Sequence, residues 1–159
     1  MTMEMTLVPF KVPGKIFRSA MPYSRYDPQG MLIPAYTENK ISMVVMLSSD
    51  EEAVRITGRD LTKIYESEGF EVVHLPIQDF GIPEISRIRE VISIVDSHSE
   101  SGGNVAIHCH AGVGRTGMFL ACLAKITKGY SPEDAINWVR EFVPGAVEIP
   151  DQERLVSMV

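Results

Sequence analysis

Several features are scarce in this sequence, and each shortage narrows the possible functions. The 159 residues include two cysteines, Cys109 and Cys122, in different sequence contexts, so we expect two reduced thiols and a cytoplasmic protein. The longest uncharged apolar stretches, residues 41–49 and 116–124, are far shorter than the roughly 20 residues of a membrane span. The N-terminus MTMEMTLVPF lacks the basic and apolar regions of a secretory signal, so we expect no membrane association.

Basic residues are also in short supply. The chain has 15 Lys and Arg against 21 Asp and Glu, a net charge of -6, and no basic cluster. Nucleic-acid binding is therefore not expected, and any anion site must be built locally from a few donors. Apolar residues make up 45% of the chain, enough for one buried core, and the length predicts a single domain, residues 1–159. We expect it to be a monomer.

Apolar patterns predict an α/β fold, with a mostly parallel central sheet of about 4–5 strands flanked by helices. Runs rich in Val and Ile predict strands at residues 15–18, 41–47, 71–77 and 104–109. Helical spacing of apolar residues predicts helices from residue 83 to 101, from 114 or 115 to 128, from 132 to 143, and from 150 onward. Residues 1–40 are rich in proline and otherwise look irregular.

The segment VAIHCHAGVGRTG carries the chemistry. It places Cys109 at the end of a buried strand and Arg115 at the start of a helix, with His110, Ala111, Gly112, Val113 and Gly114 between them. The two glycines permit a tight loop whose amides point inward at a phosphate, next to the positive end of the helix. Arg115 adds a planar fork for two phosphoryl oxygens. The same surroundings favour a Cys109 thiolate, so the phosphate site also forms a nucleophile.

These residues resemble a known family. HCHAGVGRTG is similar to the signature of the cysteine-based protein tyrosine phosphatase superfamily, and HLPIQDFGIPE and PGAVEIPDQE are similar to its other segments, as in small atypical dual-specificity phosphatases. The resemblance covers roughly residues 70–156. It implies a protein tyrosine phosphatase-like fold, with Cys109 as nucleophile and Arg115 as phosphate clamp. It also implies that neither a metal nor an organic cofactor is needed.

The resemblance also assigns supporting roles. It implies that Asp79 is the general acid, that Thr116 helps the thiolate to leave, that Gln152 orients the hydrolytic water, and that His108 tunes the cysteine. The chemistry separately requires a carboxylic acid to protonate the leaving oxygen and later to take a proton from water. Asp79 follows an apolar run that should end at the same sheet edge as the Cys109 strand, and Glu84 is its nearest rival.

Three other motifs are weaker. Residues 112–117 spell GxGxxG, but too little chain follows for a dinucleotide domain. Residues 79–81 spell the kinase triplet Asp-Phe-Gly, but the chain is too short for a kinase, and Arg115-Thr116 does not complete a Walker loop.

The expected substrates are phosphorylated proteins, phosphotyrosine first, with phosphoserine and phosphothreonine left open. Tyr23 or Tyr26 could line the entrance. One alternative is an inositol or lipid phosphate phosphatase, whose loop would carry lysines where this chain has His110 and Val113. Another is a catalytically silent phosphate-binding module, although such proteins would be expected to have lost the cysteine, the arginine or the acid.

Overall fold

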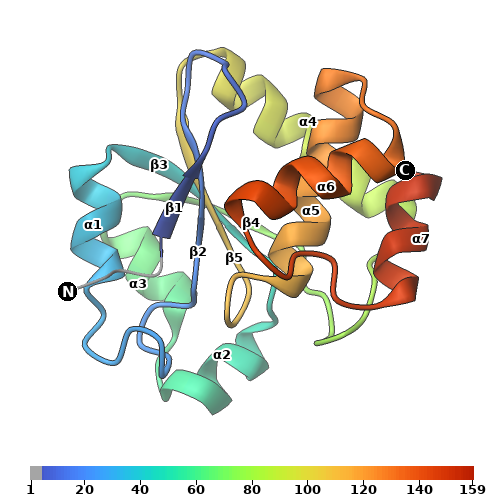
Figure 1. The fold of residues 1–159 in the computed structure, drawn as a ribbon. Coiled ribbons are helices and arrows are strands. Elements are labelled where there is room, and N and C mark those ends of the chain that lie inside the picture. The colour runs from blue at the N-terminus through green and yellow to red at the C-terminus, as the bar shows by residue number, and fades with distance from the viewer. Residues whose placement is uncertain (1–4) are drawn as a thin grey trace.

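A mixed sheet of five strands forms the centre of the computed structural model, which describes residues 5–159. Residues 1–4 lie outside the described residues. They are part of the predicted domain and of the N-terminus for which no secretory signal was predicted. The strands are β1 (Met5–Val8), β2 (Ile16–Ser19), β3 (Ile41–Met46), β4 (Glu71–His74) and β5 (Asn104–His108). Their order is β1-β2-β5-β3-β4, and only β1 runs antiparallel to its neighbour (Figure 1). The predicted mostly parallel sheet is confirmed.

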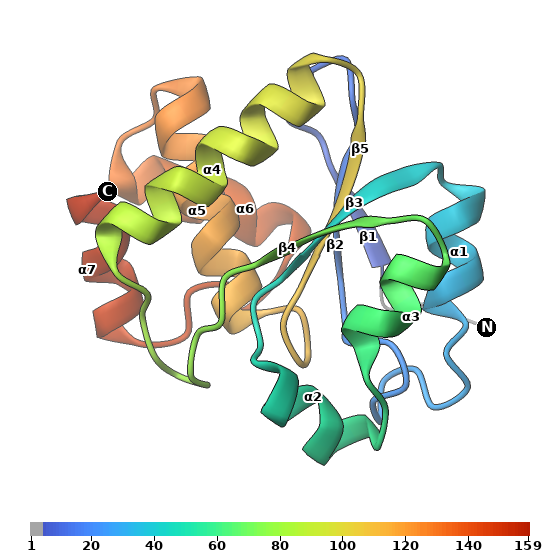
Figure 2. The same cartoon turned by 180° about the vertical axis from the view of Figure 1, so that it is seen from behind.

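Seven helices cover the two faces of this sheet. They are α1 (Leu32–Glu38), α2 (Asp50–Thr57), α3 (Leu61–Ser67), α4 (Ile85–Glu100), α5 (Gly114–Lys128), α6 (Pro132–Phe142) and α7 (Pro150–Met158). Helices α4 to α7 pack on one face, and α1 to α3 supply the buried residues of the other (Figure 2). No helix within residues 5–159 is both long and apolar enough to cross a membrane.

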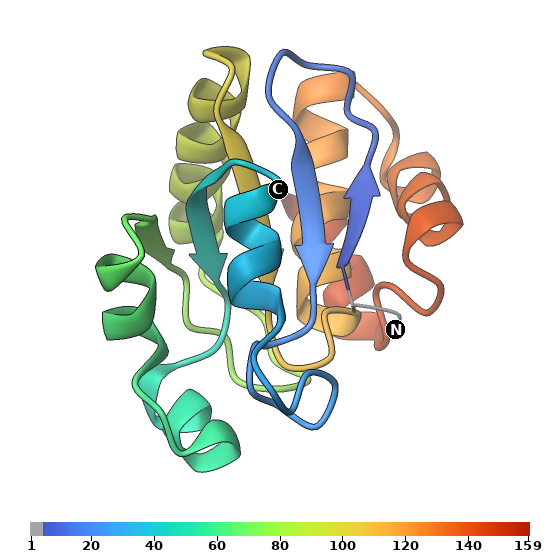
Figure 3. The ribbon, with the colours of Figure 1, turned by 90° about the vertical axis from the view of Figure 1, so that its left-hand side faces the viewer.

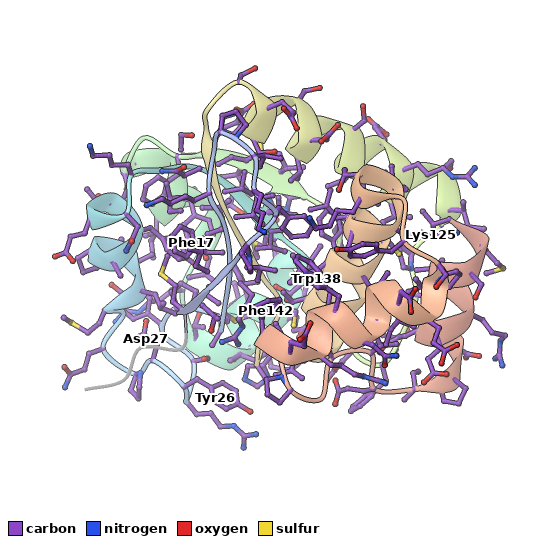
Figure 4. The ribbon with its side chains drawn as sticks, turned by 45° about the horizontal axis from the view of Figure 1, so that its top comes forward. Phe17, Tyr26, Asp27, Lys125, Trp138 and Phe142 are labelled. Atoms are coloured by element: carbon purple, nitrogen blue, oxygen red, sulfur yellow. The ribbon has the colours of Figure 1, made fainter. Side chains whose placement is uncertain are left out.

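The central strands β3 and β5 are largely apolar on both faces because both faces are covered. On β5, Val105 and Ile107 pack among α4 to α7, whereas Ala106 packs among the residues of α1 and α3. Figure 4 shows the same division, with Phe17 on the α1 side and Trp138 on α6. The sheet therefore separates two hydrophobic cores, one on each of its faces.

The four predicted helices are confirmed, with ends that differ by one or two residues. Two parts of the chain were predicted wrongly. The strand predicted at 15–18 is present as β2, but residues 5–40 also contain β1 and α1, which were not predicted. No helix was predicted where α2 and α3 lie. The strand predicted at 71–77 ends at His74, although Leu75 and Ile77 still donate their amides to the carbonyls of Met46 and Leu47.

The parallel strands deliver their ends to one edge of the sheet. The segments that follow β2, β3 and β5 all leave the lower end of the sheet in Figures 1 and 3, where Figure 3 looks onto the face covered by α1. Strand β4 is separated from β5 by β3, so residue 79 reaches this end by way of the extended segment after β4 rather than from a neighbouring strand.

Candidate active site

The loop of residues 109–113 joins β5 to α5 and is held from outside. Arg18 on β2 donates from Nε to the carbonyl of Gly112 at 3.0 Å and from Nη2 to that of Ala111 at 2.7 Å. The carbonyl of His110 accepts from the amide of Met21 at 2.8 Å. Because a trans peptide points its N–H opposite to its carbonyl, these three bonds turn the following amides toward the inside of the loop.

Gly112 is required by this arrangement. Its φ is +77°, and a Cβ at this position would lie 2.2 Å from the carbonyl oxygen of Ser19 and 2.3 Å from the guanidinium of Arg18. Only glycine tolerates both the left-handed backbone and the close approach of β2. The loop can therefore sit directly against the strand that holds its carbonyls.

Arg115 in the first turn of α5 keeps one edge of its guanidinium free. Nη1 donates to Glu52 Oε1 and to the carbonyl of Ile77, both at 2.8 Å, and Nη2 donates to Glu52 Oε2 at 2.8 Å. These bonds use three of the five N–H groups. The other two, on Nε and Nη2, lie on one edge of the fork and have no hydrogen bond within residues 5–159. That edge suits two oxygens of a phosphoryl group.

Glu52, on α2, was missed in the sequence analysis. Its side chain is buried against Arg115. Burial alone would raise the pKa of Glu52, but the hydrogen bonds and charge of Arg115 outweigh burial and lower it. Burial would likewise lower the pKa of Arg115, but Glu52 and the nearby Cys109 raise it. Glu52 stands three residues after Ser49, which is the spacing of a capping box, and the amide of Glu52 does donate to the Ser49 hydroxyl. The sequence therefore indicates a helix cap at Glu52 and not a partner of Arg115.

Cys109 is 3% exposed, and its sulfur accepts a hydrogen bond from the Thr116 hydroxyl at 3.2 Å. Behind it, His108 Nδ1 lies 2.9 Å from the carbonyl of Cys109, and its Nε2 lies 2.7 Å from the Tyr65 hydroxyl. Burial lowers the pKa of His108 to about 4, so the ring is neutral at pH 7.

The hydrogen bonds of His108 fix its tautomer. A carbonyl only accepts, so Nδ1 carries the proton, Nε2 is the acceptor, and Tyr65 donates to it. Tyr65, on α3, is a further residue that sequence reasoning missed, because the contact joins positions 43 residues apart.

Asp79 lies at the rim of the site. Its side chain is 56% exposed, and Oδ1 is 3.5 Å from Nη2 of Arg115. Oδ1 also accepts from the amide of Phe80, whose φ of +58° marks a tight turn. The rival acid, Glu84, is exposed at the N-terminus of α4 and forms no ion pair with Arg115 within residues 5–159. The geometry therefore places Asp79, and not Glu84, beside Arg115.

A pocket of about 340 Å³ opens above Cys109. It is lined by Arg25, Tyr26, Asp79, Phe80, Cys109, His110, Ala111, Gly114, Arg115 and Glu148. Of the two tyrosines considered for the entrance, only Tyr26 lines it; the ring of Tyr23 lies under the guanidinium of Arg59 instead.

Gln152 is fully buried and does not line this pocket. Its Oε1 accepts from the amide of Glu148 at 2.8 Å, and its Nε2 has no partner within residues 5–159. The second cysteine, Cys122, lies in the core on α5, where burial raises its pKa to about 12. Both cysteines are unpaired, as predicted.

Comparison with known proteins identifies relatives of this site. A family model described as a polymorphic toxin system DSP-PTPase phosphatase matches residues 27–129, more than half of the chain. The tyrosine-protein phosphatase cdc-14 of Caenorhabditis elegans is 29% identical over 154 residues, which cover 92% of this chain and 20% of that protein. The chain thus spans about a fifth of the length of the first curated relatives that it matches.

Solved structures agree on the fold. Tk-PTP in its active form is 28% identical, with a TM-score of 0.81 over 99% of this chain and 97% of that chain. A kinase associated phosphatase, with its catalytic-site cysteine replaced by serine, is 20% identical with a TM-score of 0.87, covering 98% of this chain and 93% of that one. At that identity the second likeness concerns the fold alone.

Proposed function

Because this chain belongs to the DSP-PTPase phosphatase family, within the cysteine-based protein tyrosine phosphatase superfamily, we propose that it hydrolyses phosphate monoesters on proteins. One observation carries the proposal: the free edge of the Arg115 guanidinium and the sulfur of Cys109 face the same pocket, with the carboxylate of Asp79 at its rim. A phosphoryl group held by that edge and by the loop amides lies directly over the sulfur.

The reaction has two steps. In the first, the Cys109 thiolate attacks phosphorus, the bond from phosphorus to the ester oxygen breaks, and protonated Asp79 gives its proton to the leaving oxygen. In the second, water attacks the cysteinyl phosphate, Asp79 takes a proton from that water, and the sulfur leaves as a thiolate. The Thr116 hydroxyl, 3.2 Å away, stabilises the departing sulfur by a hydrogen bond. Inward amides and Arg115 stabilise the equatorial oxygens in both steps.

Gln152 can take part in this reaction only if its side chain moves from its position in the structure. Its unpartnered Nε2 supports a contact with water, but the side chain is fully buried and its Oε1 accepts from the amide of Glu148. Orientation of the hydrolytic water by Gln152 therefore requires that the segment of residues 148–152 shift when the phosphoenzyme forms. His108 acts through the backbone of Cys109 and does not enter the pocket.

Phosphotyrosine is the first substrate class of the proposal, with phosphoserine and phosphothreonine as further substrates. The printed names of the family and of the cdc-14 relative support this choice. Two carboxylates at the pocket, Asp79 and Glu148, weigh against an inositol polyphosphate, whose additional phosphates they would repel. We further propose that the enzyme is cytoplasmic, because two unpaired cysteines are typical of a reducing compartment. We also propose that it is a monomer, which size-exclusion chromatography with light scattering tests.

Release of p-nitrophenol from its phosphate tests the activity. Cys109→Ser should abolish turnover while retaining a wild-type circular dichroism spectrum, whereas Cys122→Ala, which removes the other thiol, should retain turnover. Asp79→Asn should slow substrates with poor leaving groups most, because those depend on protonation. A chelator should not inhibit. Turnover by the Cys109→Ser variant at the wild-type rate would refute the proposed nucleophile.

A further inference from the structure

The mouth of the pocket carries two opposite charges that the proposed chemistry does not use. Arg25 comes from the segment between β2 and α1, and Glu148 comes from the segment between α6 and α7. Figure 1 shows these two segments on opposite sides of the loop that follows β5. Both side chains are exposed, and neither has an ion-pair partner within the described part of the chain.

Arg25 is held in place rather than loose in solvent. Its guanidinium lies 5.0 Å from the centre of the Tyr26 ring and donates to the Tyr26 hydroxyl at 2.9 Å. The Tyr26 ring in turn packs edge-on against the ring of His110 at 5.5 Å. Buried Asp27 fixes this segment, because its carboxylate accepts the amides of Met31 and Leu32 at 2.9 Å each (Figure 4). One positive charge therefore stands at a defined place on the rim.

Glu148 lies on the other side of the pocket and is positioned through its backbone. A Cβ placed on Gly114 would lie 1.8 Å from Glu148 Oε1, so the carboxylate leans over the start of α5. Its amide is bonded to buried Gln152 at 2.8 Å. A carboxylate so close to an anion site opposes phosphate binding by its charge, which makes it costly unless the bound substrate compensates it.

We infer that Arg25 and Glu148 read the charges that flank the phosphorylated residue, so that an acidic residue of the substrate lies beside Arg25 and a basic one beside Glu148. The inference rests on the proposed phosphatase function and names its substrate class, a phosphopeptide with opposite charges on its two sides. Exposed ion pairs of this kind change binding by about two- to five-fold each. A substrate with the same charge on both sides is attracted by one of these two side chains and repelled by the other.

Four phosphotyrosine peptides of equal length test the inference, carrying Glu-Glu or Lys-Lys on each side of the phosphotyrosine. One of the two mixed peptides should show the highest kcat/KM, about two- to five-fold above either peptide with like flanks. Arg25→Gln should remove the preference for the acidic flank alone, and Glu148→Gln the preference for the basic flank alone. Arg89→Gln and Glu141→Gln, exposed changes of the same charge on α4 and α6, should leave the ratios unchanged.

Ratios between peptides, and not absolute rates, decide the outcome. Equal kcat/KM for all four peptides, or variants that change all four by the same factor, would overturn the inference. Affinities of the Cys109→Ser variant for the same peptides separate this result from the proposed function. If p-nitrophenyl phosphate is hydrolysed but these affinities are equal, the charge reading alone fails; if nothing is hydrolysed but they differ as stated, the phosphatase proposal alone fails.

Discussion

Glu52→Gln should damage both the stability and the catalysis of this protein, because it removes the carboxylate that aims Arg115. In the native structure the two oxygens of Glu52 accept from Nη1 and Nη2 at 2.8 Å each. A glutamine of the same shape offers one oxygen and one NH2 group, so one guanidinium donor would face another donor. The ion pair is lost at a site where Arg115 is 2% exposed.

The expected magnitude follows from these contacts. Removing one partner of a buried ion pair costs about 3–5 kcal/mol of stability. We expect about 3 kcal/mol, because the carbonyl of Ile77 still accepts from Nη1 and Asp79 still lies 3.5 Å from Nη2. A fork that is free to rotate no longer presents its Nε and Nη2 edge to the phosphoryl oxygens. We expect kcat/KM to fall about 100-fold, equivalent to about 2.7 kcal/mol of transition-state stabilisation.

Two measurements check this reasoning, and a neighbouring residue provides the control. Urea unfolding gives the change in stability, and hydrolysis of p-nitrophenyl phosphate, without denaturant, gives kcat/KM. Glu51→Gln makes the same chemical change one residue earlier on α2, at an exposed position, and should alter stability by less than about 0.5 kcal/mol. A Glu52→Gln protein with the kcat/KM and the unfolding midpoint of the Glu51→Gln protein would refute the argument.

Three further predictions concern the surroundings of Cys109. Tyr65→Phe leaves Nε2 of His108 without its donor, so it should lower the free energy of unfolding by about 1–3 kcal/mol and lower kcat. It should also change the signal of the His108 ring in nitrogen-15 NMR. Tyr36→Phe removes a hydrogen bond that does not involve His108, so it should leave that signal unchanged. Because the pKa of His108 is lowered from 6.5 to about 4, the stability that the neutral ring contributes is complete above pH 6.5 and is lost as the pH falls toward 4. Urea unfolding should show that the free energy of unfolding falls by about 3 kcal/mol over that window. A His108→Gln protein should not show this loss. Gly112→Ala should abolish turnover and vanadate binding. Gly129→Ala, with a similar φ of +70° but open space, should cost only about 1–2 kcal/mol of stability in the same unfolding assay.

The sequence alone predicts the parts of the site that are close together in the chain. The spacing between Cys109 and Arg115 is local, so it predicts a strand, a tight loop and a helix in that order, and the structure has them. Asp79 lies 36 positions before Arg115, and its role was expected from the family resemblance. The apolar run before it indicated only that it follows a strand ending at the same edge of the sheet. Its route differs, since β3 lies between β4 and β5.

The residues that hold the site from behind were not predictable in this way. Arg18, Glu52 and Tyr65 each bond the loop or its neighbours from more than 40 positions away, and nothing in their local sequence identifies the partner. Several charged or aromatic residues could have filled each of these places. Only the folded arrangement of β2, α2 and α3 around the end of β5 selects them.

The missed helices have physical reasons of their own. Helix α2, with sequence DEEAVRIT, buries only Glu52 and Ala53, so it has no apolar stripe to reveal it. Helix α1 contains Pro34, which usually argues against a helix. There it occupies the third helical position, where the amide has no partner within the helix in any case.

The orientation of a few N–H donors, more than net charge, explains how a protein of charge -6 can bind a phosphate group. The charge of Arg115 is already balanced by Glu52, and the other donors of the cradle are uncharged amides turned inward because Arg18 and Met21 hold their carbonyls outside. Donors fixed before the substrate arrives need no rearrangement as charge moves from the sulfur through the phosphoryl group to the leaving ester oxygen. The acidic composition that excludes nucleic-acid binding is therefore compatible with a phosphate site, because the site depends on the positions of a few N–H groups and not on the average charge around them.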